Sequence, residues 1–305
     1  MPELPDIVVY IEALERRVLG EAVVGVRVVS PAVVRTYDPP YDAPVGRTVV
    51  SIERVGKRIA FGFGDGGEPA PDPSTRLYVV IHLMVAGRLR WESPGKPIPK
   101  KIGLAAIDFP SGSLILTEQG TRKRAGIWVM ANWDDVASLD RGGVEPLEVS
   151  TARFGETLRA ENRTLKRALT DPRIFSGIGN AYSDEILWSA QLSPVKRTAQ
   201  LGDDEVSRLH EAVVESLETW TQRLRDEVGD DWPKKVTAFR QDMAVHGKYG
   251  EPCPRCGSKV QRIVYSSNET NYCATCQTDG KLLADRSLSR LLKDDWPKTL
   301  EELEG

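Results

Sequence analysis

The apolar residues near the start of the chain recur every three or four positions, which predicts an amphipathic helix with one buried face. The residues of this stripe are Ile7, Tyr10, Ile11, Leu14 and Val18. Pro5 suits the first turn of such a helix, where the backbone N–H has no helical partner in any case. We therefore expect a helix that packs one face against the elements after it.

From residue 22 to about residue 130 the pattern changes to short β-branched runs separated by Gly and Pro. Runs of this kind are typical of strands. They lie at residues 23–29, 48–52, 58–63, 77–84, 104–109, 114–117 and 127–130. Many short strands in succession favour a β-sandwich.

After a connector at residues 141–146 the spacing of apolar residues becomes helical again. Apolar positions from Val206 to Val228 fall on one side of a single long helix, which Asp203 or Asp204 can cap. The last part of the chain carries all the cysteines and most of the local positive charge, with eleven Lys or Arg against six Asp or Glu over residues 231–293.

The overall charge limits the partners. A net charge of -3 and a pI near 5.8 argue against a general polyanion binder, because a phosphate-binding face usually makes a domain basic. The basic last part leaves room for a nucleic-acid face on one side only. The longest apolar runs, such as residues 77–83, are too short for a membrane span, and Met1-Pro2-Glu3 lacks the basic start of a signal peptide. We expect a cytoplasmic protein that does not contact a membrane.

The cysteines give the strongest single motif. Cys253-Pro-Arg-Cys256 and Cys273-Ala-Thr-Cys276 are sixteen residues apart, which fits a four-thiolate zinc site. Four thiolates leave no open coordination position, so we expect one structural zinc ion rather than a catalytic one. The residues between the pairs, 261–265 and 270–272, can form a hairpin. By itself the motif predicts a zinc ribbon and identifies no partner.

The first residues carry candidate chemistry. Removal of Met1 would leave Pro2 with a secondary amine, and α-amino groups titrate near pH 7.7–8.0, well below lysine at about 10.4. A neutral amine attacks aldehydic carbons to form Schiff bases, and the adjacent Glu3 can transfer protons. Taken alone, Pro2-Glu3 is better explained as the ordinary start of a helix.

Other motifs are individually weak. The glycine-rich turn at residues 177–182 can offer backbone N–H groups to a phosphate, but a tight turn between helices explains it equally simply. Lys57 before a strand and the basic segment 120–126 are phosphate contacts or solvated turns. His82 in an apolar strand is better explained as a core histidine than as a ligand or base.

Taken in order, these motifs resemble the formamidopyrimidine-DNA glycosylase / endonuclease VIII family. The resemblance runs from Pro2 to Cys276, and the motifs that carry it are Pro2-Glu3-Leu4-Pro5-Asp6, Lys57, His82-Leu83, Gly177-x-Gly179-Asn180-x-Tyr182-x-x-Glu185, Gly247-Lys248-Tyr249-Gly250-Glu251-Pro252-Cys253 and the paired cysteines. It implies an α+β multidomain fold, with an N-terminal helix and β-sandwich, a helical domain with a helix–two-turns–helix motif, a C-terminal zinc-finger hairpin, and DNA in the cleft between. The expected boundaries are 1–133 for the first domain, 134–152 for a linker, 153–240 for the helical domain and 241–305 for the finger with an extension.

The resemblance also implies roles. Pro2 would be the nucleophile on the anomeric carbon of a damaged nucleotide, and Glu3 the acid and base for sugar opening and elimination. Lys57, counted with the catalytic set, and Asn180 would hold phosphates beside an everted nucleotide. Arg122 would touch the unpaired partner base, and Cys253, Cys256, Cys273 and Cys276 would hold zinc.

This sequence departs from the family pattern at four places. Asp6 stands where the family has glutamate. Asn268 stands where the finger inserts an arginine toward a phosphate, and Arg262 is an alternative cation for that contact. Arg124 stands where an aromatic wedge would be, with Met84 or Val85 as other void fillers. Finally, 29 residues follow Cys276, and five leucines in them predict a short packed helix: Leu282, Leu283, Leu288, Leu291 and Leu292.

Three functions fit this pattern. The first is a base-excision DNA glycosylase for oxidised bases with abasic-site lyase activity by β,δ-elimination, acting as a monomer on double-stranded DNA that contains a damaged base or an abasic site. The second is an abasic-site lyase without base excision. The third is a non-catalytic module that binds damaged DNA through the finger and Asn180. The Pro2-Glu3 pair favours catalysis, because binding alone requires no amine beside a carboxylate.

Overall fold

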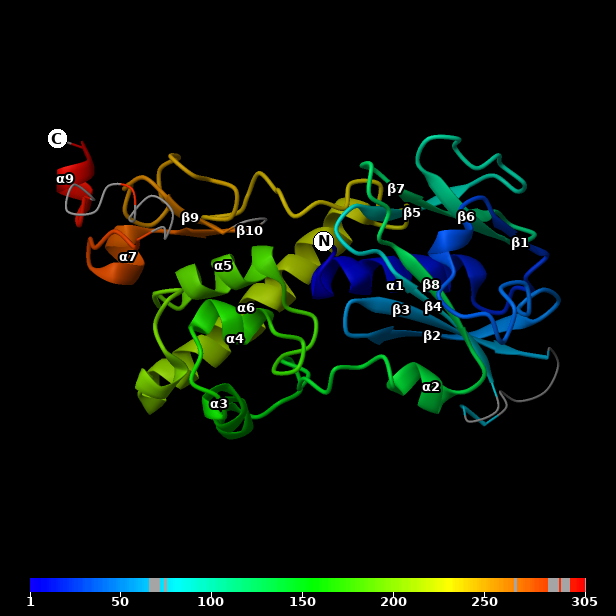
Figure 1. The fold of residues 1–305 in the computed structure, drawn as a ribbon, viewed down its shortest axis with the longest axis horizontal. Helices are drawn as coiled ribbons and strands as arrows, with labels where there is room; N and C mark the ends of the chain where they lie inside the picture. Colours follow the sequence, from blue (N-terminus) through cyan, green and yellow to red (C-terminus); the bar gives the residue numbers. More distant parts are fainter. Residues whose placement is uncertain (66–71, 74–75, 266–267, 285–290, 292–296, 305) are drawn as a thin grey trace. The chain divides into compact units, whose positions relative to one another are not determined.

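Helix α1 (Leu4–Val18) begins the chain and buries the predicted apolar stripe. The computed structural model describes residues 1–65, 72–73, 76–265, 268–284, 291 and 297–304. The chain divides by contacts into two units, which are Met1–Arg141 with Trp220–Thr237, and Gly142–Thr219 with Ala238–Gly305. In the first unit α1 packs against the strands β2 and β3 (Figure 1).

Two antiparallel four-stranded sheets form the rest of the first unit (Figure 1). One has the order β1 (Gly25–Val28), β6 (Gly103–Asp108), β7 (Ser113–Glu118), β5 (Gly87–Glu92). The other has the order β2 (Thr48–Val55), β3 (Arg58–Gly64), β4 (Leu77–His82), β8 (Gly126–Met130). Apolar residues from both sheets and from α1 join in one core, so the predicted helix-led sandwich is confirmed.

Strand β5 is the one strand of these sheets that the sequence pattern did not predict. In Gly87–Glu92 the apolar Leu89 and Trp91 alternate with Arg88 and Arg90, so no continuous β-branched run exists. The alternation is that of an edge strand with one face buried, and β5 does lie at the edge of its sheet.

The contact division also assigns a short helix and a later segment to the first unit. Helix α2 (Trp133–Ala137) lies within the expected linker, yet Val136 packs with the outer residues of β4 and β8. Trp232 and Val236, which follow the long helix α6 (Asp203–Val228), join the sandwich core. The domain boundaries themselves stay a prediction.

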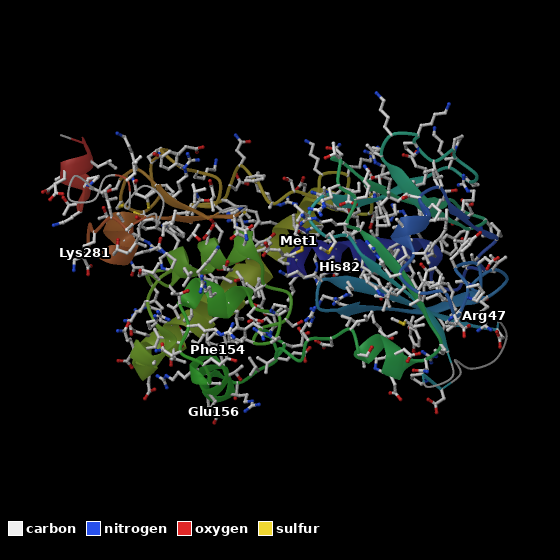
Figure 2. All side chains as sticks on the ribbon, viewed as in Figure 1. Met1, Arg47, His82, Phe154, Glu156 and Lys281 are labelled. Carbon is white, nitrogen blue, oxygen red and sulfur yellow. The ribbon has the colours of Figure 1, made fainter. Side chains whose placement is uncertain are left out.

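The second unit contains a helical part and a finger. Helices α4 (Leu165–Thr170) and α5 (Asn180–Ser189) are joined by residues 171–179, in which Gly177 has a φ of +79°. Phe154, labelled in Figure 2, stacks on Phe175 at 4.6 Å between ring centroids. The finger pairs strands β9 (Gln261–Tyr265) and β10 (Asn268–Tyr272), as the sequence predicts. The remaining elements are η1 (Pro31–Val33), α3 (Thr151–Arg159), η3 (Thr198–Gln200), α7 (Ala274–Thr278) and α9 (Leu300–Glu304).

Two expectations need correction. Asp203 and Asp204 lie inside α6, so neither is its cap, and Gly202 precedes the helix with its N–H bonded to Oε2 of Glu205 at 3.2 Å. In the extension, Leu282 and Leu283 pack on the finger core from a non-helical segment, and Leu291 is 78% exposed. Leu288 and Leu292 lie outside the described residues. Within the described part of the chain, every helix is too short or too polar to cross a bilayer.

Candidate functional site

The first turn of α1 places two carboxyl groups at the start of the chain. Glu3 is the N-cap, and its backbone N–H donates to Oδ2 of Asp6 at 2.9 Å. Both residues are buried. The positive end of the helix dipole favours negative charge at this position. The departure at residue 6 therefore keeps a carboxylate that caps the helix.

The N-terminal amino group is surrounded by charges of both signs. Burial lowers its pKa below the usual value of 8.0; Glu3 and Asp6 act against this, while Arg88 and Lys57 add to it. In this structure the amine belongs to Met1, and Pro2 behind it is buried. An amine with a lowered pKa is neutral, and therefore nucleophilic, in a larger fraction of molecules near pH 7.

Lys57 and His82 come from neighbouring strand ends of the same sheet. Lys57 lies in the turn between β2 and β3, after Gly56 with a φ of +62°. Arg58, the next residue, pairs across the sheet with His82 at the end of β4. Burial, and then Arg58 and Lys57, lower the pKa of His82 to about 4. His82, labelled with Met1 in Figure 2, is therefore neutral at pH 7 and a weak base.

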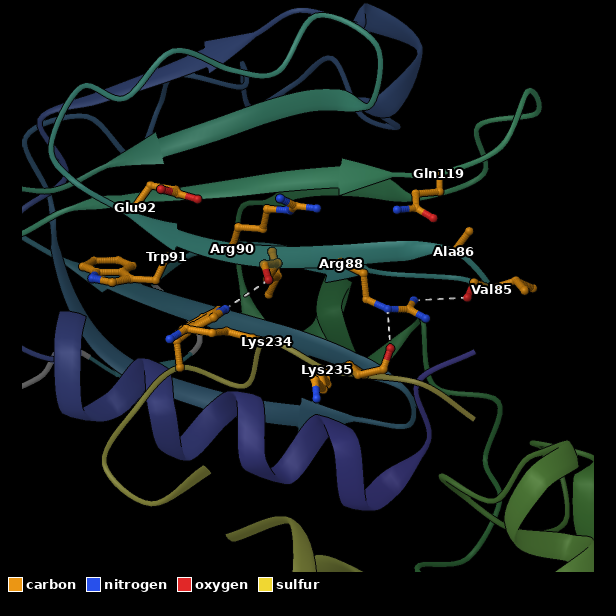
Figure 3. Close-up of a pocket in the computed structure, with 12 residues that line it drawn as sticks. Val85, Ala86, Arg88, Arg90, Trp91, Glu92, Gln119, Lys234 and Lys235 are labelled. Atoms are coloured by element: carbon orange, nitrogen blue, oxygen red, sulfur yellow. Dashed lines mark hydrogen bonds between the residues drawn. The ribbon is translucent and has the colours of Figure 1, made fainter. Parts of the chain in front are cut away.

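A pocket of about 590 Å³ lies between β5 and the segment 232–236 (Figure 3). Its lining residues include four cationic ones, which are Arg88, Arg90, Lys234 and Lys235. Glu92 is the one carboxylate of the lining, and Trp91 and Trp232 add aromatic surface. Sequence reasoning missed this pocket, because the segment after α6 carries no motif.

The basic loop between β7 and β8 folds over a buried carboxylate. Oε2 of Glu118 accepts from the backbone N–H groups of Arg124 at 2.7 Å and Ala125 at 3.0 Å. Arg122 is exposed beside them, as a residue that reaches toward a ligand must be. Val85, one of the alternative void fillers, is 57% exposed, whereas Met84 is half-buried with a φ of 53°.

In the second unit, Asn180 lies at the start of α5. Its side-chain Nδ2 donates to the carbonyl of Glu269 in β10 at 2.9 Å, and its own carbonyl accepts from Nζ of Lys166 at 2.6 Å. The amide thus joins α5 to the finger hairpin. Its expected contact with phosphate stays a prediction.

A buried cluster behind α5 was not predicted. Oδ1 of Asp184 pairs with Nζ of Lys166 at 2.6 Å, and Oδ2 lies 2.7 Å from Nδ1 of His246. The neighbouring Glu185 accepts from the backbone N–H groups of Ala244, Val245 and His246 at 2.7–2.9 Å. The glutamate of the GxGNxYxxE motif therefore anchors the segment that leads into the finger.

The four cysteines converge as predicted. Their sulfur atoms all lie within 4.8 Å of one another, with 3.4 Å between Cys256 and Cys273 and 4.0 Å between Cys253 and Cys276. A tetrahedral zinc site with Zn–S bonds of about 2.3 Å separates sulfurs by about 3.8 Å, so the donor set fits one structural zinc ion. Trp188 of α5 donates its indole N–H to Sγ of Cys253 at 3.3 Å.

The hairpin residues considered for phosphate contact face different ways. Asn268 is exposed at the start of β10. Arg262 pairs in register with Asn271, lies over the ring of Tyr249 at 4.2 Å and reaches Oε2 of Glu269 at 3.5 Å. The guanidinium of Arg262 is thus already engaged with neighbouring side chains.

Comparison with known domains assigns most of the chain. Residues 1–125 match the formamidopyrimidine-DNA glycosylase N-terminal domain, and residues 143–225 match the formamidopyrimidine-DNA glycosylase H2TH domain. Residues 250–278 match a zinc finger found in FPG and IleRS. The three matches follow the order of the resemblance.

Whole proteins are similar over nearly the full length. A formamidopyrimidine-DNA glycosylase of Corynebacterium aurimucosum is 30% identical, with 92% of this chain and 97% of that protein covered. One of Lactococcus lactis subsp. cremoris is 28% identical, with 91% and 99% covered. Among solved structures, the Lactococcus lactis Fpg in complex with DNA containing an abasic site has a TM-score of 0.77 at 25% identity, covering 90% of this chain and 99% of that one. The same protein with DNA containing an oxidised pyrimidine has a TM-score of 0.77 at 26% identity, covering 91% and 100%.

Proposed function

This chain belongs to the formamidopyrimidine-DNA glycosylase family, and we propose from that premise that it is a DNA glycosylase and abasic-site lyase of base-excision repair. Its substrate is double-stranded DNA with an oxidised base or an abasic site, in line with the DNA in the complexes of its structural relatives. The observation that carries the proposal is the N-terminal amine, whose pKa is lowered and which adjoins the buried carboxyl of Glu3.

In the proposed reaction, the nitrogen of Pro2, freed by loss of Met1, bonds to the anomeric carbon of the sugar. The damaged base leaves from that carbon and Glu3 protonates the ring oxygen, so the sugar opens as an iminium ion. Loss of a proton from the adjacent carbon then expels the 3′ phosphate, and a second elimination expels the 5′ phosphate. Lys57 and Asn180 hold the flanking phosphates, which fixes the everted nucleotide without selecting a sequence.

Borohydride trapping on abasic DNA tests the nucleophile, because reduction of the iminium gives a permanent covalent link. We expect the link at Pro2, identified by peptide mass. A form with Met1 or a tag retained should lose trapping, whereas Pro2→Gly, which also ends in an amine, should keep part of it. Full trapping by the Met1-retaining form would contradict the assignment.

A second candidate is abasic-site lyase activity without base excision. The observation that favours it is the packing of the segment after α6, in which Trp232 and Val236 are held in the sandwich core beside the pocket. A panel of oxidised purine and pyrimidine duplexes, scored separately for base release and strand nicking, distinguishes the two. Nicking of abasic DNA with no release from any duplex supports the second candidate.

A further inference from the structure

Arg88 joins the start of β5 to the segment 232–236. Its Nε donates to the carbonyl of Val236 at 2.6 Å. Its Nη1 donates to the carbonyls of Gly87 at 2.6 Å and Val85 at 3.2 Å (Figure 3). A guanidinium is a rigid planar fork with five donors, so three carbonyl acceptors fix its position closely.

The segment that Arg88 holds is packed rather than loose. Trp232 donates its indole N–H to the carbonyl of Leu89 at 3.1 Å, and its ring lies 5.6 Å from that of Tyr10. Trp232 and Val236 are 6% and 7% exposed. The wall of the pocket is therefore formed before any ligand arrives.

The same arginine acts on the start of the chain. The charged groups with the largest effect on the terminal amine come from three elements: Glu3 and Asp6 at the head of α1, Lys57 in the β2–β3 turn, and Arg88 in β5. The two carboxylates favour the ammonium form, and the two cations favour the neutral amine. Of the cations, Arg88 has the larger effect. Its guanidinium keeps its charge at every physiological pH.

We propose that Arg88 is a positioning residue for the reaction, which by binding the carbonyls of Val85, Gly87 and Val236 fixes a permanent positive charge beside the N-terminus and keeps the amine neutral. This rests on the proposed function, in which that amine is the nucleophile. Arg88 also fixes the pocket wall, so the geometry of the pocket and the reactivity of the amine depend on one side chain.

The test is the pH dependence of borohydride trapping on abasic DNA at saturating protein. Loss of the charge in Arg88→Gln should move the midpoint to higher pH. A shift of about half to one pH unit lowers trapping about threefold to tenfold below the midpoint. Arg88→Lys should keep the midpoint, because the charge stays. It should raise hydrogen exchange in residues 232–236, because an ammonium cannot bridge three carbonyls.

Arg90→Gln is the matched control. Arg90 lies two residues further along β5 and lines the same pocket, but it is not among the four charges that act most on the amine. Its removal should leave the midpoint unchanged. Equal thermal midpoints of the variants exclude misfolding as the cause.

A second measurement needs no DNA. The terminal amine can be titrated by its pH-dependent acylation, read by peptide mass, in wild type and Arg88→Gln. Failure of wild type to be trapped would count against the proposed function, while this titration would still decide the role of Arg88. An unchanged amine midpoint in a folded Arg88→Gln protein overturns the inference, as does a uniform loss of trapping at every pH.

Discussion

Lys166 and Asp184 form an ion pair of 2.6 Å in which the carboxylate is fully buried and the lysine side chain is 11% exposed. The same lysine binds the carbonyl of Asn180, and the same aspartate lies against His246. The pair therefore connects α4, the start of α5 and the segment that leads into the finger. Its role is to hold the surface that carries Asn180.

Breaking this pair should destabilise the protein strongly. Asp184→Asn leaves a buried ammonium without its counter-charge, which costs about 3–5 kcal/mol. Chemical denaturation, followed by a signal from the second unit, measures the change. Removing the exposed pair of Arg153 and Glu156, with side chains 64% and 68% exposed, is the control and should cost less than about 1 kcal/mol. Equal losses for the two pairs would contradict this account.

Zinc removal should unfold the finger. Four converging thiolates bind the metal only when the finger is folded, so metal binding stabilises the fold. Metal analysis of the purified protein should give one zinc ion per chain, and Cys253→Ser should lose it and expose residues 250–278 to protease. Thr275→Ser, a change at an exposed position between two of the cysteines, should keep the metal. Retention of full protease resistance without zinc is the result that this prediction excludes.

Restoring a cation to the finger should strengthen DNA binding. Asn268 is exposed in β10, and Arg262 is already engaged with Glu269 and Tyr249. Asn268→Arg should add one phosphate contact and steepen the slope of log K against log salt by about 0.9. Titrations at several salt concentrations measure it, with Asn268→Gln as the uncharged control. An unchanged slope would mean that this position does not reach the DNA.

His82 should make stability depend on pH between about 6.5 and 4. Its pKa is about 4 in the folded protein, because of burial and the charges of Arg58 and Lys57, against 6.5 when unfolded. In this window the unfolded state binds more protons, so stability falls as the pH falls, by at most about 3 kcal/mol for this group. His82→Gln should lose this dependence while matching the wild-type slope from pH 7 to 8. Parallel curves down to pH 4 would rule out the effect.

Much of the fold could be predicted because it depends on residues close in sequence. The apolar stripe of α1 and the β-branched runs repeat over a few positions, and each run gives its element directly. The two cysteine pairs carry their own spacing, so their convergence followed from the motif. Strand β5 escaped because its arginines interrupt the apolar run that identified the others.

The candidate site divides in the same way. The sequence by itself determined the order of the elements, the thiolate cluster and a proline and a glutamate at the start of a helix, because these rest on local spacing and residue chemistry. Only the tertiary structure decided that Arg88 holds Val236, 148 residues away, and that Lys166 and His246 share Asp184. Such contacts follow from chain packing, which brings together groups that no periodic pattern links. The reactivity of the terminal amine depends on those neighbours, since burial and nearby charge set its pKa.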